Sequence, residues 1–179
     1  MFLSLIRRRR SIRRYTQEPV SAEKLELLVE AALRSPSSMG NNPWEFVIVT
    51  DPDVLEKLSK AKPHGATFLK KAALGIIVCA DPKKSSVWIE DASIAAIYVH
   101  LAAESLALGS CWIQIRDRMH TEEISAGAYI SELLDIPGNL QVEAMVAIGH
   151  PAEKIAPHPE ETLQYQKVFF GAYGRPYRG

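Results

Sequence analysis

The residues best suited to chemistry are in an arginine-rich stretch, residues 7–14, with the sequence RRRRSIRR. It holds six arginines and one serine, and the next acidic residue is Glu18. The chain has 21 basic and 21 acidic side chains, so the remainder carries 15 basic against 21 acidic groups, a net charge of −6. Because the guanidinium fork binds phosphate oxygens in pairs, the stretch predicts an anion site. A solvated helix end and a patch for a polyanion remain open as alternatives.

A second candidate element is the loop at residues 35–43, SPSSMGNNP. Ser37 and Ser38 offer hydroxyl groups, and the N–H groups of a loop are free to point at a ligand. Gly40 lets a flat group approach the backbone closely. An ordinary turn is the alternative. The loop is not a G-x-x-x-x-G-K-[ST] phosphate loop, and no G-x-G-x-x-G follows a strand, which disfavours nucleotide folds of those kinds.

Other chemically capable side chains give weaker signals. His100 and Glu104 are spaced i, i+4 on an expected helix and predict a buried polar pair, because no third ligand stands at a spacing suited to a metal. No serine lies in G-x-S-x-G, and no Cys–His pair is suggested. We therefore expect no catalytic side chain and no metal, so that any difficult chemistry would belong to a cofactor.

The composition is that of an ordinary globular protein, with 179 residues, 47% hydrophobic and 23% charged. This length predicts a single domain over residues 1–179. A net charge of zero disfavours a general nucleic-acid partner. Cys79 and Cys111 stand far apart in apolar runs, which predicts free buried thiols and a cytoplasmic protein. The N-terminal apolar run is too short for a signal peptide or a membrane span.

The elements that must position these residues alternate between helices and short apolar strands. We expect helices at residues 2–9, 22–33, 51–58, 88–108 and 121–134. We expect strands at residues 46–49, 74–80, 111–115 and 142–148. Ser21 is the expected N-cap of the second helix, and Gly109 is expected just after the end of the fourth.

The C-terminal segment, residues 157–179, is rich in aromatic residues and has few aliphatic residues beside them. Tyr165, Phe169, Phe170, Tyr173 and Tyr177 are five of the chain's 14 aromatic residues. Aromatic side chains with no local core should pack on another surface. We expect that surface to belong to a partner subunit, with the chain's own domain as the alternative.

Several segments together resemble the FMN-dependent nitroreductase family. They are RRSIRRY at residues 9–15, SPSSMGNNPWEFVIV at 35–49, DASIAA at 91–96 running into LALGSCWIQI at 106–115, and AIGHPAEK at 147–154. The resemblance covers about residues 7–155. It implies an α+β fold with a central, mostly antiparallel sheet flanked by helices. It also implies an intimate homodimer, with FMN in a cleft between the subunits. The aromatic segment, residues 157–179, is then expected to be a dimerisation arm on the partner.

The resemblance also implies which residues grip the phosphate of FMN. The family's R-x-S-x-[RK] element corresponds to Arg9, Ser11 and Arg13, with Arg10 near them. A basic residue near the C-terminus usually completes this clamp, and Lys167 is the first candidate here, with Arg175 second.

The flavin ring would be contacted by two further segments. The P-S-S loop places Pro36, Ser37, Ser38 and Asn42 beside the flavin, and the segment after G-x-C-W places Gln114 and Ile115 near its reactive nitrogen. Many members have asparagine where this chain has Gly40, and glutamine where it has Asn42, whose amide is one methylene shorter.

The implied activity is hydride transfer from NAD(P)H through bound FMN to nitroaromatic, quinone or similar acceptors by a ping-pong mechanism, without nucleic acid or membrane partners. One alternative keeps the fold with other flavin chemistry, namely flavin fragmentation, reductive dehalogenation or heterocycle oxidation. The other is a non-catalytic module that binds a polyanion.

Overall fold

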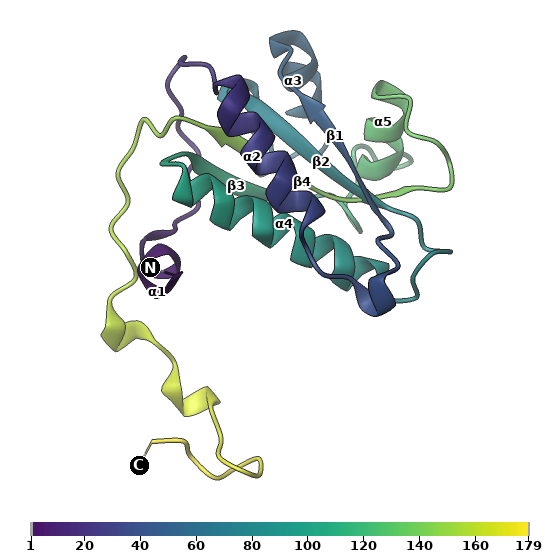
Figure 1. Ribbon diagram of the computed structural model, residues 1–179. Helices are drawn as coiled ribbons and strands as arrows, with labels where there is room; N and C mark the ends of the chain where they lie inside the picture. The colour runs from purple at the N-terminus through teal and green to yellow at the C-terminus, as the bar shows by residue number, and fades with distance from the viewer. Residues whose placement is uncertain (1, 179) are drawn as a thin grey trace.

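The computed structural model describes residues 2–178 and contains a four-stranded sheet in the order β1-β2-β4-β3, with every neighbouring pair antiparallel (Figure 1). The strands are β1 (Trp44–Val49), β2 (Leu74–Ala80), β3 (Gly109–Gln114) and β4 (Gln141–Gly149). The inner strands β2 and β4 are buried almost throughout, because both faces of the sheet are covered. The expected α+β fold with a central antiparallel sheet is confirmed.

Two layers of helices cover the sheet (Figure 1). One core cluster lies between the sheet and helices α2 (Ala22–Leu33) and α4 (Trp88–Ser105). The other lies between the opposite face and helices α3 (Pro52–Leu58) and α5 (Ala126–Leu133), with the 3-10 helix η2 (Thr67–Lys71) beside them. The shorter elements are α1 (Phe2–Arg8), η1 (Ser38–Gly40), η3 (Glu160–Thr162) and η4 (Tyr165–Lys167).

Helices α2 and α3 each begin directly after a residue whose side chain caps the first turn. The Ser21 hydroxyl accepts a hydrogen bond from the Lys24 N–H, and the Asp51 carboxylate accepts from the N–H groups of Asp53 and Val54. These bonds satisfy donors that the first turn of a helix leaves free, so α2 begins where the sequence predicts and α3 begins one residue later. Within residues 2–178, no helix has both the length and the hydropathy needed to span a bilayer.

Two expected helix boundaries were wrong. Helix α4 ends at Ser105, and the left-handed residue after it is Ala107, with φ 57°, whereas Gly109 already belongs to β3. Helix α5 starts only at Ala126, because the Thr121 hydroxyl accepts from the Ile124 N–H and closes a turn ahead of the helix. At the start of α5, a local hydrogen bond outweighs the helix-like pattern.

Candidate active site

The arginine-rich stretch continues from α1 as an extended segment along the start of β3. Ser11 forms a parallel bridge with Ser110, and the Ile12 N–H donates to the Ser110 carbonyl at 3.0 Å. Successive side chains of an extended segment point to opposite sides. The segment therefore separates into two faces, one with Arg9, Ser11 and Arg13 and the other with Arg10 and Ile12.

Arg9, Ser11 and Arg13 come together beside Cys111. Burial raises the pKa of the Cys111 thiol, while the positive charges of Arg13 and Arg9 and a hydrogen bond from Ser11 act in the opposite direction. All three side chains therefore influence the same thiol, from alternate positions on one face of the extended segment. Within residues 2–178 neither Arg9 nor Arg13 forms an ion pair, so both positive charges are available to an anionic ligand. The structure thus brings the expected phosphate residues into one group.

The backbone of this segment is fixed by two side chains. The Tyr15 hydroxyl donates to the Ile12 carbonyl at 2.6 Å and to the Ala147 carbonyl at 3.3 Å. The Glu153 carboxylate accepts from the N–H groups of Arg13 at 2.7 Å and Arg14 at 3.1 Å. Hydrogen bonds to a charged acceptor are among the stronger ones in proteins, so the guanidinium of Arg13 extends from a well-held backbone.

Arg10 is not part of this group. Its guanidinium donates to the carbonyl of Ala156, at the start of the C-terminal segment. Arg10 therefore fixes the start of the C-terminal segment, on the face of the extended segment opposite Arg9, Ser11 and Arg13. The C-terminal candidates for the clamp, Lys167 and Arg175, are also not brought to the arginines in this chain, since the segment leads away from the sheet (Figure 1).

The serine-rich loop is a compact turn with unusual backbone angles. The Ser37 hydroxyl donates to the Asn42 side-chain oxygen at 2.8 Å and accepts from the Asn42 N–H at 2.9 Å. Met39, Gly40 and Asn42 all have positive φ. Pro36 is exposed at the start of the turn. The short Asn42 amide is therefore occupied in holding the loop closed.

A buried carboxylate that the sequence reasoning missed anchors this loop. Asp91, only 2% exposed in the first turn of α4, accepts from the Ser38 N–H at 2.8 Å and from the Ser85 hydroxyl at 2.7 Å. An acidic residue at the positive end of a long helix was the available signal. Asp91 also opens the DASIAA segment of the family resemblance.

Within one chain the arginines and the loop lie far apart. Arg8 pairs with Glu104 near the end of α4, whereas the loop is bound to Asp91 near its start. These two helix positions are about 20 Å apart at 1.5 Å per residue. The loop leads into β1 and the arginines lie on β3, which are the two edges of the sheet (Figure 1). Within one chain the two elements are therefore separated by the width of the sheet.

The two residues expected near the flavin ring differ in their surroundings. Gln114 ends β3 half-buried, and its amide is fixed by the Trp112 Nε1–H donating to it and by its own donation to the Arg116 carbonyl, both at 3.0 Å. The Ile115 side chain is fully buried in the core. Only Gln114 therefore offers a side chain to a ligand at this end of the strand.

The expected pair of His100 with Glu104 was wrong. The His100 Nδ1 atom lies 2.8 Å from the Ser110 hydroxyl, and Glu104 binds Arg8 instead. Burial, together with the positive charge of Arg9, lowers the pKa of His100 to about 4. His100 is thus a neutral partner that holds Ser110 behind the phosphate residues.

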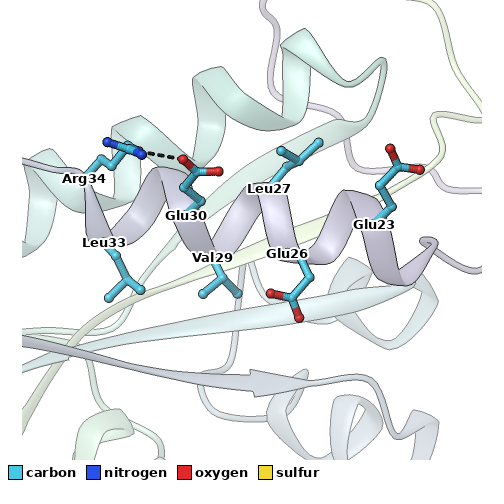
Figure 2. Close-up of a pocket in the computed structure, with 7 residues that line it drawn as sticks. All are labelled: Glu23, Glu26, Leu27, Val29, Glu30, Leu33 and Arg34. Atoms are coloured by element: carbon cyan, nitrogen blue, oxygen red, sulfur yellow. Dashed lines mark hydrogen bonds and ion pairs between the residues drawn. The ribbon is translucent and has the colours of Figure 1, made fainter.

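A surface depression of about 630 Å³ lies on α2 and not beside these residues (Figure 2). Its rim carries Glu23, Glu26 and Glu30, and its one arginine, Arg34, is paired with Glu30 at 2.7 Å. An acidic surface of this kind does not suit a phosphate ligand.

Comparisons with known proteins agree with this arrangement. The model of the Nitroreductase family matches residues 6–88 and 62–150. A solved structure of an FMN-dependent nitroreductase from Clostridium difficile R20291 has a TM-score of 0.94 and 44% identity, covering 96% of this chain and 99% of its own. An Archaeoglobus fulgidus protein named "Putative NADH dehydrogenase/NAD(P)H nitroreductase" is 38% identical over 85% of this chain and 86% of its own length. The "FMN reductase [NAD(P)H]" of Bacillus subtilis is 29% identical over 89% of this chain and 71% of its own length. The chain therefore belongs to the nitroreductase family.

Proposed function

We propose that this chain is an NAD(P)H-dependent oxidoreductase that binds FMN and reduces nitroaromatic, quinone or similar acceptors by a ping-pong mechanism. When bound, FMN supplies the ring that accepts hydride and passes on electrons. The observation that carries the proposal is that Arg9, Ser11 and Arg13 share one face of the extended segment at the start of β3, and that within residues 2–178 neither guanidinium is paired with an acid. The names of the similar proteins, FMN-dependent nitroreductase and FMN reductase, support the same assignment.

The proposed FMN site extends along the edge strand β3. Ser110, beside Ser11, and Gln114 are four residues apart on this strand, which corresponds to about 13 Å at 3.3 Å per residue. With the FMN phosphate held beside Ser110, the flavin ring would lie near Gln114. The role of the chain is then to orient and bind, with donors at both ends and no side chain acting as an acid or base.

The proposal includes a homodimer in which each site takes its arginines from one subunit and its serine-rich loop from the other. This follows from the separation of the two elements on opposite edges of the sheet. Exposed apolar side chains support a protein partner: Phe2, Leu3 and Ile6 on α1, Ile94, Ile97 and Tyr98 on α4, and Phe170, Tyr173 and Tyr177 near the C-terminus. Apolar surface of this extent is characteristic of interfaces.

Residues 157–179 would act as the dimerisation arm of a single domain, residues 1–179. Lys167 is proposed to complete the phosphate clamp once this arm is in place, with Arg175 as the second choice. The free buried thiols of Cys79 and Cys111 suit the reducing conditions of the cytoplasm, where we place the protein.

An absorbance spectrum of the purified chain tests the assignment. We expect a yellow protein whose flavin bands are bleached by NAD(P)H and return when a quinone or nitroaromatic compound is added. A colourless protein that also fails to bind added FMN would exclude the proposal. Loss of the flavin itself under oxygen would favour flavin fragmentation, and nucleic-acid binding that weakens steeply with salt would favour a polyanion-binding module.

A further inference from the structure

A buried acid in β4 lies behind the segment that we propose to contact the flavin ring. The pairing of β4 with β2 shifts at this point, since Val78 pairs with Ala144 and Cys79 with Val142, so Glu143 has no partner in β2. Such a β-bulge redirects a side chain out of the regular alternation, and bulges are frequent next to active sites. Glu143 is 2% exposed, so its carboxylate is removed from water.

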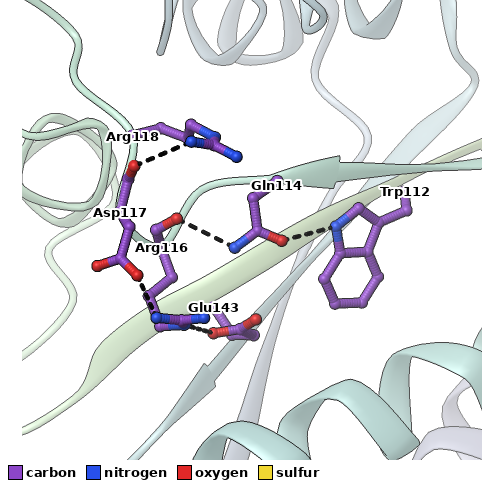
Figure 3. A network of polar contacts seen from close by, with 6 residues as sticks. All are labelled: Trp112, Gln114, Arg116, Asp117, Arg118 and Glu143. Atoms are coloured by element: carbon purple, nitrogen blue, oxygen red, sulfur yellow. Dashed lines mark hydrogen bonds and ion pairs between the residues drawn. The ribbon is translucent and has the colours of Figure 1, made fainter.

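The carboxylate of Glu143 is directed at Arg116. The Arg116 Nε–H donates to Glu143 Oε2 at 2.9 Å (Figure 3). The backbone N–H groups of Ile115 and Arg116 both donate to the Glu143 carbonyl, at 3.2 and 3.0 Å. Burial raises the pKa of Glu143, while the charge of Arg116 and hydrogen bonds from Arg116 and Gln114 oppose that rise. One residue thus holds both the backbone and the side chain of Arg116.

Arg116 in turn fixes the amide of Gln114. The Trp112 indole can only donate, and the Arg116 carbonyl can only accept, so the Gln114 oxygen must face Trp112 and its nitrogen must face Arg116 (Figure 3). The flipped amide would place donor against donor. A connected series of polar contacts therefore runs from the bulge at Glu143 to the half-buried end of β3.

We propose that Glu143 is a positioning residue, which sets the placement of the Arg116 guanidinium and the Gln114 amide and so tunes the reduction potential of the bound flavin. The inference rests on the proposed function. Reduction adds negative charge to a flavin ring, so a nearby guanidinium favours the reduced form and a nearby carboxylate disfavours it. Arg116 also pairs with the exposed Asp117, so the balance between its guanidinium and the two carboxylates, of which only that of Glu143 is buried, then sets the potential.

Opposite shifts in two variants test this role. Glu143→Gln removes the negative charge while keeping the shape, and should raise the midpoint potential of bound FMN. Arg116→Gln removes the positive charge and should lower it. We expect each to change the ratio of affinities for reduced and oxidised FMN by about tenfold, which for a two-electron couple is about 30 mV. Arg34→Gln just after α2, which removes an equal charge outside this series of polar contacts, should leave the potential unchanged.

The measurement is a dye-referenced reductive titration, with the FMN dissociation constant determined in parallel. A merely structural role would loosen the site in both variants and shift the potential in one direction, which would overturn the inference. An unchanged potential in Glu143→Gln would also overturn it, even if Arg116→Gln does not fold. A wild-type chain that binds no FMN would instead overturn the proposed function, and this inference with it.

Discussion

A Cβ atom added to Gly109 would lie 2.7 Å from the Cγ2 atom of Ile12. Ile12 stands between Ser11 and Arg13, and Gly109 is the first residue of β3. The absence of a side chain at position 109 therefore lets the arginine-bearing segment lie directly against the strand. This close approach, and not the end of a helix, explains the glycine.

Gly109→Ala should consequently destabilise the fold and weaken FMN binding together. We expect a loss of about 1–3 kcal/mol of unfolding free energy, because the methyl group forces Ile12 out of a well-packed position. Urea denaturation and a flavin fluorescence titration measure the two effects. Gly127→Ala is the control, since a Cβ atom there meets nothing within 4 Å and the residue lies in α5. Equal stability changes in the two variants would contradict the packing argument.

Arg13→Ala should weaken FMN binding without unfolding the protein. We expect a loss of about 1.5–3 kcal/mol in binding free energy, the typical value for a hydrogen bond to a charged group. Arg14→Ala removes the same charge from the adjacent exposed position and should have a much smaller effect, because its side chain points to the other side of the segment. Equal losses in the two variants would indicate that only the overall positive charge matters.

The proposed division of the site between two subunits can be tested by mixing two damaged chains. Arg13→Ala disables the phosphate residues, and Ser38→Pro removes the N–H that donates to Asp91 and holds the loop. In a heterodimer of these two chains, one site collects both defects and the other collects neither. We therefore expect differently tagged, co-purified heterodimers to bind half as much FMN as the wild type.

The two parent homodimers are the controls for this experiment, because every site in them carries one defect and should bind FMN weakly. If each site were built within a single chain, both sites of the heterodimer would also carry one defect. Flavin binding that is no better in the heterodimer than in its parents would therefore refute the shared site.

Truncation after Ala156 should abolish the dimer. The truncated chain keeps the contact between Arg10 and Ala156 but loses the exposed aromatic residues of the proposed arm. We expect sedimentation velocity to give a monomer or an insoluble product. A truncated chain that still sediments as a dimer would show that the surfaces of α1 and α4 suffice.

The sequence predicted well several elements whose ends depend on an apolar run or a capping residue. The observed bounds of β2 agree with the expected ones, since an uninterrupted apolar run defines this strand. Ser21 caps α2 as predicted, and α3 begins at Pro52, one residue after its expected start. The end of α4 was misplaced because Gly109 has a tertiary role, contact with Ile12, that no local pattern reveals.

The candidate site was predictable in its residue types but not in its arrangement. The alternation of an extended segment predicts that Arg9 and Arg13 share a face. The anchors Asp91 and Glu143 act on residues 53 and 27 positions away in the chain, so their partners could not be inferred from spacing. The separation of the arginines from the loop likewise depends on strand order, which only the fold supplies.

His100 gives a final prediction, on the pH dependence of stability. Burial first, and the charge of Arg9 second, lower its pKa from 6.5 to about 4, so the folded state resists a proton that the unfolded state accepts. The contribution of His100 is therefore complete above pH 6.5, decreases as the pH falls from 6.5 towards 4, and levels off below. The shift corresponds to roughly 3 kcal/mol at 1.36 kcal/mol per pKa unit.

In His100→Gln, which keeps a polar group near Ser110, the unfolding free energy should fall less steeply between pH 6.5 and pH 4 than in the wild type. Urea denaturation at intervals between pH 7 and pH 4 measures both slopes, with His64→Gln as the exposed control. A His100→Gln slope equal to that of the wild type would show that other groups govern the acid response.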